Sequence, residues 1–162
     1  MEQTVQKQRV AVYCRVFAGS EDHPASLAAQ AAYYTEMVGQ RPDWDLAGIY
    51  ADRGITGASR QKRKEFKKML TACQKGKIDI ILVKSISRFS RNIMESLETV
   101  RMLKAHGVGV IFEKENIDTR MESGELQVAV FHELARMESE SLEKSHGCPC
   151  RYRCIHVAHR KE

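Results

Sequence analysis

A long hydrophobic run is the first feature that this sequence lacks. No stretch approaches the roughly 18 to 20 apolar residues that a membrane-spanning helix needs, and residues 1–9 are mostly polar, unlike the apolar core of a signal peptide. The cysteines number five, which is odd, and Cys14 and Cys73 each stand alone within apolar segments, which argues against a disulfide framework. We therefore expect a protein of a reducing compartment, with a cytoplasmic location and no membrane partner.

The sequence also lacks the motifs of two common kinds of phosphate-binding or phosphate-cleaving protein. There is no glycine-rich loop of the P-loop or dinucleotide-binding type, because Gly107-Val108-Gly109 is too short and opens a strand. Asp52 and Asp118 stand alone rather than in the carboxylate cluster of a metal nuclease. We expect no cofactor and no metal. A small nucleotide- or phosphate-binding α/β protein is a remote alternative, which tight binding of a mononucleotide would favour.

Net charge is small outside one short segment. The 162 residues carry a formal charge of +5, but residues 147–162 contribute four basic side chains and one acidic one, or +3 of that total. Only about +2 is left for the rest of the chain, so bulk charge is a weak argument for nucleic-acid binding. Local clusters of basic residues have to carry that argument.

Hydrophobic periodicity predicts alternating strands and helices in a chain long enough for one domain with a proper core. The expected strands are residues 9–16, 44–50, 78–84 and 108–112, and the expected helices are 26–39, 64–75, 92–106 and 123–145, with Ser26 and Ser123 as caps. Residues 52–62 are expected to form a polar loop. This pattern predicts the α/β class: a single layered domain with a mainly parallel central sheet flanked by helices, plus a long C-terminal helix.

Residues 147–162 depart from this periodicity. We expect the α/β domain to span residues 1–146 and the segment 147–162 to be an irregular tail, either disordered or frame-shifted. The tail contains metal-ligand residue types, but its Cys-x-Cys-x3-Cys-x-His-x2-His spacing matches no common zinc site. A DNA-recognition domain encoded in another frame downstream of residue 146 would identify the tail as a frameshift product.

Four arginines near the ends of predicted elements are candidates for holding a phosphate. Arg15 ends the first strand, Arg88 and Arg91 follow the third, and Arg63 lies where the polar loop meets a helix. A planar guanidinium can bridge two phosphate oxygens, and the carboxyl ends of parallel strands lie at one edge of a sheet. The alternatives are a solvated pair for Arg88 and Arg91, although the helix dipole disfavours cations there, and a solvated charge run for Arg63.

Several motifs occur together in one order. They are YCRV at 13–16, SLxxQ at 26–30, DRGITG at 52–57, Arg63, VKSISRFSRN at 83–92 and FEKENIDT at 112–119. With these motifs the chain resembles the catalytic domain of serine site-specific recombinases, the resolvase/invertase family, and particularly its large transposon-type members. The resemblance extends over residues 9 to about 145.

The resemblance implies a function in DNA recombination. In that family a serine attacks DNA and forms a 5′-phosphoserine link, and a tetramer cuts four strands, rotates and rejoins them. The implied partners are double-stranded DNA and either further copies of the chain (a dimer, and a tetramer in synapsis) or full-length relatives. The implied site consists of Arg15, Arg63, Arg88 and Arg91 to hold the scissile phosphate, Gln30 and Asp52 to support the site, and position 17 for the nucleophile.

Position 17, however, holds phenylalanine. A phenyl ring has no lone pair that could attack phosphorus, so we expect Phe17 to make this chain deficient in cleavage. Ser20 is the nearest hydroxyl, and it is a remote substitute because a displacement of ~1 Å already costs large rate factors. Without a recognition domain after residue 146, we expect phosphate contacts alone to give weak DNA binding, with Kd on the order of 10⁻⁴ to 10⁻⁶ M at physiological salt.

The last predicted helix carries an apolar face and an unusual charge. We expect its face of Leu126, Val130, Leu134 and Met137 to serve partly in core packing and partly in packing between subunits. Glu140 stands where many relatives have an arginine, which reverses a charge on the helix that would approach DNA.

The leading hypothesis is the catalytic domain of a serine DNA recombinase that does not cleave as written. One alternative is a non-catalytic, oligomerising regulator of full-length relatives, or the remnant of a mobile-element recombinase. Another is that Phe17 is an engineered or sequencing change in an active lineage. The substitution Phe17→Ser separates these alternatives.

Overall fold

The residues that the structure describes form a sheet of five strands in the order β2-β1-β3-β4-β5. A computed structural model describes residues 6–16, 24–53, 63–90 and 92–146, and the predicted tail lies outside these ranges. Four strands are parallel: β1 (Gln8–Val16), β2 (Trp44–Arg53), β3 (Ile80–Val83) and β4 (Gly109–Phe112). The fifth strand, β5 (Ile117–Asp118), pairs antiparallel with β4. The predicted α/β class with a mainly parallel sheet is confirmed.

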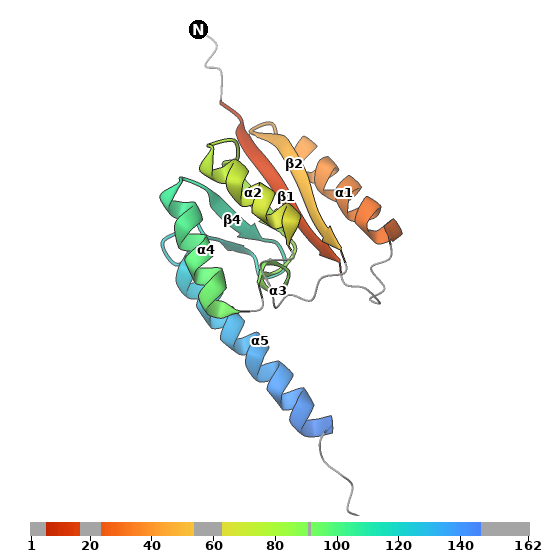
Figure 1. The fold of residues 1–162 in the computed structure, drawn as a ribbon, viewed down its shortest axis with the longest axis vertical. Coiled ribbons are helices and arrows are strands. Elements are labelled where there is room, and N and C mark those ends of the chain that lie inside the picture. Colours follow the sequence, from red (N-terminus) through yellow and green to blue (C-terminus); the bar gives the residue numbers. More distant parts are fainter. Residues whose placement is uncertain (1–5, 17–23, 54–62, 91, 147–162) are drawn as a thin grey trace, which may run out of the picture.

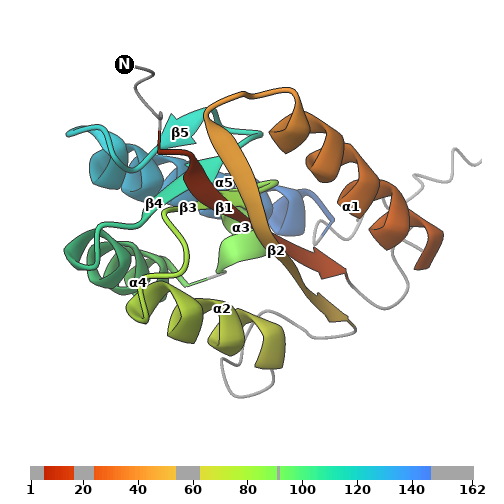
Figure 2. The same cartoon turned by 90° about the horizontal axis from the view of Figure 1, so that it is seen from above.

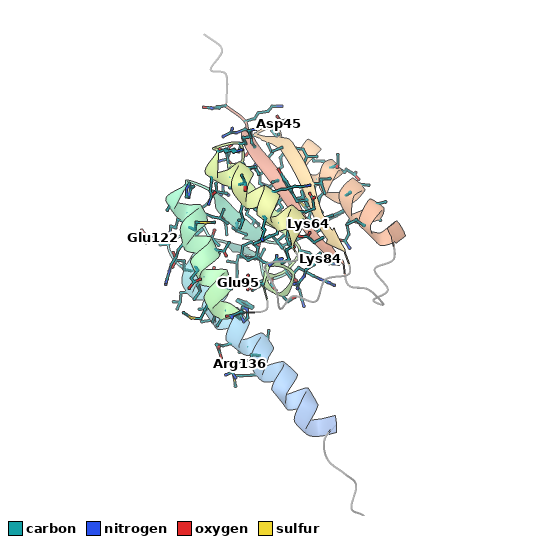
Figure 3. All side chains as sticks on the ribbon, viewed as in Figure 1. Asp45, Lys64, Lys84, Glu95, Glu122 and Arg136 are labelled. Carbon is teal, nitrogen blue, oxygen red and sulfur yellow. The ribbon has the colours of Figure 1, made fainter. Side chains whose placement is uncertain are left out.

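Helices cover both faces of the sheet. They are α1 (Pro24–Gly39), α2 (Lys64–Gln74), the short α3 (Ile86–Phe89), α4 (Ile93–Ala105) and α5 (Gly124–His146). Helix α1 lies on one face, and α2 and α4 lie on the other (Figure 2). Helix α5 begins beside α4 and then extends beyond the sheet (Figure 1), so that Arg136 stands away from the main body (Figure 3). The predicted long C-terminal helix is therefore present.

The alternating side chains of β1 build two hydrophobic cores. Val10, Val12 and Cys14 belong to the core beneath α1, whereas Ala11 and Tyr13 belong to the larger core beneath α2 and α4. A strand buried on both faces is expected to be apolar at nearly every position, as β1 is from Val10 to Cys14.

The position of β1 between β2 and β3 creates a reversal in the winding of the sheet. The chain passes from β1 to β2 over one face by way of α1, and from β3 to β4 over the other by way of α4 (Figure 2). In open α/β sheets, ligands bind outside the carboxyl ends of the strands at such a reversal. Figure 3 marks this edge by Lys84 and the opposite, amino edge by Asp45.

Several predicted boundaries differ from the structure. Helix α1 begins at Pro24, two residues before the predicted cap Ser26, because proline suits the first turn of a helix. Strand β2 continues past the predicted end at Tyr50, and Asp52 therefore lies in a strand opposite Arg15 rather than in a loop. Helix α3 and strand β5 were not predicted at all.

The apolar face of α5 does not pack into the core, contrary to the expectation that it would do so in part. Leu126 is 68% exposed and Met137 is 60% exposed, and Val130 and Leu134 are also exposed. Val128, on a different side of the helix, is the residue that enters the core. None of the helices in the described ranges combines the length and the apolar character needed to cross a membrane.

Candidate phosphate-binding site

Arg15 and Arg88 come together where β1 ends beside α3. The Nη2 atom of Arg15 donates to the carbonyl oxygen of Ser87 at 2.5 Å, and the Nη1 atom of Arg88 donates to the carbonyl oxygen of Arg15 at 3.2 Å. Arg15 is only 2% exposed and Arg88 is half-buried. These two reciprocal hydrogen bonds fix both guanidinium groups to the carboxyl edge of the sheet.

Arg63 is buried at the start of α2. Its side chain is 1% exposed, and its guanidinium carbon lies 3.7 Å from the ring centroid of Phe66. Its Nε atom donates to the hydroxyl of Tyr13 at 3.0 Å, while Nη1 and Nη2 have no hydrogen-bond partner among the described residues. The alternative of a solvated charge run is therefore wrong for Arg63. A buried cation with two unused donor groups is costly to hold, and a bound ion is one of the explanations for such unsatisfied groups.

Asp52 anchors the start of α2 and reaches Arg63 only indirectly. Its carboxylate accepts from the backbone N–H groups of Glu65 at 3.0 Å and Phe66 at 3.1 Å, two of the otherwise unsatisfied donors at a helix start. It also accepts from the Tyr13 hydroxyl at 3.1 Å. Asp52, Tyr13 and Arg63 thus form a chain of hydrogen bonds in which a neutral hydroxyl separates the carboxylate from the guanidinium.

Tyr13 was missing from the predicted site. Burial raises the pKa of its phenol to about 12, and the charge of Arg63 opposes that shift. The hydroxyl therefore remains protonated and can donate to Asp52 while it accepts from Arg63. A tyrosine directly after the apolar residues 10–12 was the signal available in the sequence, because a buried hydroxyl needs a partner.

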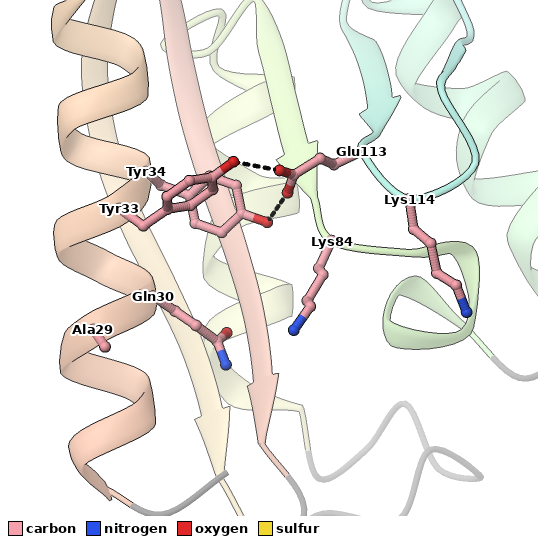
Figure 4. A pocket seen from close by; sticks show the side chains of 7 residues that line it. All are labelled: Ala29, Gln30, Tyr33, Tyr34, Lys84, Glu113 and Lys114. Carbon is pink, nitrogen blue, oxygen red and sulfur yellow. Dashed lines mark hydrogen bonds between the residues drawn. The ribbon is translucent and has the colours of Figure 1, made fainter.

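Gln30 lies on the α1 side of the sheet. It is half-buried and lines a cavity of about 630 Å³, bordered by Ala29, Gln30, Tyr33, Tyr34, Lys84, Glu113 and Lys114 (Figure 4). Glu113 accepts from the hydroxyl of Tyr33 at 2.7 Å and from that of Tyr34 at 2.6 Å. Tyr13, Phe66 and Arg63 lie instead on the α2 side, so the predicted site residues are divided between the two faces.

The segment after β4 supports the short helix α3. The Oε2 atom of Glu115 accepts from the backbone N–H of Ile86, the first residue of α3, at 3.2 Å. This contact holds the helix that carries Ser87 and Arg88. Glu113 and Glu115 were also missed, although acidic residues directly after a strand are a recognisable signal at a ligand-binding edge.

Three of the predicted arginines are thus placed at the carboxyl edge. Arg15 and Arg88 are in direct contact, and Arg63 is joined to β1 through Tyr13, two residues before Arg15. Phe17, Ser20 and Arg91 lie outside the described residues. Within the described ranges, His, Cys, Asp and Glu side chains form no group of three that could hold a metal ion.

Comparison with known proteins places this chain in a family of recombinases. Residues 10–146 match the model of the resolvase N-terminal domain, and the chain belongs to that family. The structure is similar to a resolvase family site-specific recombinase from Streptococcus pneumoniae, with 28% identity, a TM-score of 0.62, and coverage of 86% of this chain and 93% of that one. It is also similar to the N-terminal catalytic domain of TP901-1 integrase, with 26% identity, a TM-score of 0.60, and coverage of 83% and 98%.

A third similar structure comes from a mobile element. The product of the first open reading frame in transposon ISC1904 from Sulfolobus solfataricus P2 has 26% identity, a TM-score of 0.50, and coverage of 85% of this chain and 86% of that one. The resemblance to serine recombinase catalytic domains, including transposon-associated ones, is therefore confirmed.

Proposed function

We propose that this chain is a serine recombinase catalytic domain that binds the DNA backbone through its arginines and does not cleave it. The observation that carries the proposal is Arg63, buried with two terminal nitrogens that have no partner among the described residues. Family membership supplies the class of reaction. The arginines supply the chemistry, because guanidinium groups can neutralise a phosphodiester without a metal ion.

The role of the arginines follows from the charge that develops during phosphoryl transfer. Negative charge accumulates on the non-bridging oxygens of phosphorus, and donors held in a poorly solvated site stabilise it best. Arg15, Arg63 and Arg88 are each held in place by at least one hydrogen bond before any ligand arrives. They therefore need little reorganisation to receive a phosphate. Arg91, Gln30 and Asp52 keep their proposed places as a fourth phosphate ligand and as supporting residues.

Phe17 interrupts the reaction at its first covalent step. In a serine recombinase the serine oxygen attacks phosphorus, the P–O3′ bond breaks, and the 5′-phosphate becomes attached to the enzyme. A phenylalanine at this position supplies no oxygen for the new bond. Binding is therefore expected to proceed and cleavage to stop.

The exposed apolar face of α5 supports a role that does not need cleavage. Leu126, Val130, Leu134 and Met137 remain exposed over several turns of a helix that extends from the sheet (Figure 1). Apolar surface of this kind is typical of an interface between protein chains. A chain without a nucleophile that pairs with itself or with full-length relatives would act as a regulator of their recombination. The same features would also remain in a mobile-element remnant.

The test restores the nucleophile. The substitution Phe17→Ser is introduced into the chain, and the variant is fused to a DNA-binding module of known target. The fusion protein is then mixed with labelled duplexes whose central sequence is randomised and which are nicked to trap cleaved ends. We expect Phe17→Ser to form a covalent protein–DNA adduct. Phe17→Ala, which removes the ring without supplying a hydroxyl, and the double variant Phe17→Ser/Arg63→Met should form none.

The possible outcomes distinguish the alternatives. An adduct formed by the unaltered chain and mapped to Ser20 would show that Ser20 replaces the nucleophile. A folded Phe17→Ser variant that binds the target but forms no adduct would contradict the proposed arginine centre. Sedimentation of the unaltered chain and of Leu134→Lys tests the role of α5, and we expect the charged variant to remain monomeric.

A further inference from the structure

The cavity on the α1 side holds basic groups that have no assigned role. Lys84 follows β3 and Lys114 follows β4, and both side chains are exposed at the carboxyl edge of the sheet (Figure 4). Neither ammonium group forms a hydrogen bond or an ion pair with any residue in the described ranges. The cavity has a volume of about 630 Å³ and is broadly open to solvent rather than enclosed.

Among the described residues that line the cavity, the only carboxylate is that of Glu113, and it accepts hydrogen bonds from two tyrosines. Both oxygens of Glu113 accept a phenolic O–H, one from Tyr33 and one from Tyr34, at 2.7 and 2.6 Å. Glu113 therefore bonds to neutral donors although two lysines line the same cavity (Figure 4). The arrangement leaves the positive charge of Lys84 and Lys114 available to a ligand.

The cavity lies next to the arginine centre along the chain. Lys84 stands three residues before Ser87, whose carbonyl oxygen binds Arg15, and four residues before Arg88. The charge of Lys84 acts on a side chain of β1. Burial raises the pKa of the Cys14 thiol to about 11, and the charge of Lys84 opposes that rise. A polyanion bound at the arginines could therefore continue into the cavity.

We propose that this cavity is a second phosphate site, which binds a backbone phosphate of the DNA strand held by the arginines. Lys84 and Lys114 supply the positive charge, and Gln30 lines the same cavity. Tyr33 and Tyr34 act as spacers that hold Glu113 away from the lysines. This inference rests on the proposed function for the identity of its ligand, since a free nucleotide would present the same phosphate chemistry.

The first experiment measures DNA binding by fluorescence anisotropy with a labelled duplex, at several salt concentrations. Lys84→Gln/Lys114→Gln should weaken binding about tenfold at low salt and reduce the slope of log K against log salt by about 1 to 2. The matched control is Lys75→Gln/Lys77→Gln, which removes the same charge from exposed positions before β3, at the amino edge. We expect the control to keep the slope of the unaltered chain.

The second experiment tests the tyrosine spacers. In Tyr33→Phe/Tyr34→Phe, Glu113 loses both donors and should pair with the lysines, which weakens DNA binding although no positive charge has been removed. Adding Glu113→Gln to that double variant removes the competing carboxylate and should restore affinity. Weak binding that persists in the triple variant would overturn the spacer role, because a merely structural loss is not repaired in this way.

Two further arms separate the possible ligands and the two proposals. A mononucleotide that displaces the duplex at micromolar concentration would overturn the DNA assignment in favour of a nucleotide site.

If Arg63→Met weakens binding and the lysine variant does not, the cavity proposal fails and the arginine centre stands. If only the lysine variant weakens binding, the arginine centre fails, and the cavity remains a DNA-phosphate site but not one on a strand held by the arginines. No binding by the unaltered chain would contradict both proposals. All variants keep Phe17, so cleavage does not affect the result.

Discussion

Oppositely charged side chains are arranged differently at the two edges of the sheet. At the amino edge, Arg9 and Asp79 form a direct ion pair of 2.8 Å whose side chains are 45% and 34% exposed. At the carboxyl edge, Arg63 and Asp52 are both buried, and the Tyr13 hydroxyl stands between them. The exposed pair neutralises its charges, whereas the terminal nitrogens of Arg63 have no partner within the part of the chain that the structure describes. Tyrosine hydroxyls also bind a carboxylate in the cavity, where Tyr33 and Tyr34 donate to Glu113. We infer that tyrosine hydroxyls keep the basic groups of this edge available to an anion.

The largest difference between the edges should appear when an aspartate is removed. Both Asp52 and Asp79 accept three hydrogen bonds, but only Asp52 is buried. Asp52→Ala leaves the Tyr13 hydroxyl and two N–H groups of α2 without their acceptor, and should cost about 3 kcal/mol of unfolding free energy. Urea denaturation followed by circular dichroism measures the loss.

Asp79→Ala is the matched control for this prediction. It makes the same chemical change and removes the same number of hydrogen bonds, but water can replace them at an exposed position. We expect a much smaller loss than for Asp52→Ala. Equal losses in the two variants would show that burial does not distinguish the two edges.

A smaller effect on stability is expected at Arg63. Arg63→Met removes a buried cation whose terminal nitrogens have no partner among the described residues, which favours stability, but it also removes the hydrogen bond to Tyr13 and the cation at the end of the chain of hydrogen bonds from Asp52. These effects oppose each other, so the unfolding free energy should change by less than about 2 kcal/mol. The unaltered chain should also gain stability from added inorganic phosphate by RT ln(1 + [L]/Kd), and the variant should gain less. Denaturation with and without phosphate measures both effects. A loss of more than about 2 kcal/mol in the variant would mean that Arg63 serves stability rather than anion binding.

Most of the fold could be predicted because its main elements are periodic in hydrophobicity. The β1 strand and the α4 helix, for example, appear at the expected residues, with Asn92 capping α4 as a helix start requires. Helix α3 and strand β5 have four and two residues, which is too short for any periodic signal. Helix α3 depends instead on distant contacts, from Arg15 to Ser87 and from Ile86 to Glu115.

Site residues could be predicted only where the residue type and a position at the end of a predicted strand or helix were enough to identify them. Arg15 and Arg88 were expected at the edge and are found there in contact. The burial of Arg63 depends on Phe66 and on Tyr13, which lies 50 residues away, so no local pattern could reveal it. The tyrosine spacers were missed for the same reason, because Tyr34 and Glu113 are 79 residues apart.

The smallest effect should come from titrating the amino edge. Hydrogen bonding from Arg9 holds the pKa of Asp79 below its usual value, against a smaller opposing effect of burial. A carboxyl group whose pKa is lowered by folding contributes stability that is fully present above its unfolded pKa of about 3.9 and is lost as pH falls through its folded pKa. The unaltered chain should therefore lose its advantage over Asp79→Asn as pH falls from about 5 towards the folded pKa. Thermal unfolding of both proteins between neutral and acidic pH measures this.

Glu122→Gln, at an exposed carboxylate without a hydrogen bond or ion pair to the described residues, is the control (Figure 3). If Asp79→Asn and Glu122→Gln show the same pH profile, the ion pair at the amino edge contributes nothing to stability, and the contrast between the edges rests on the carboxyl edge alone.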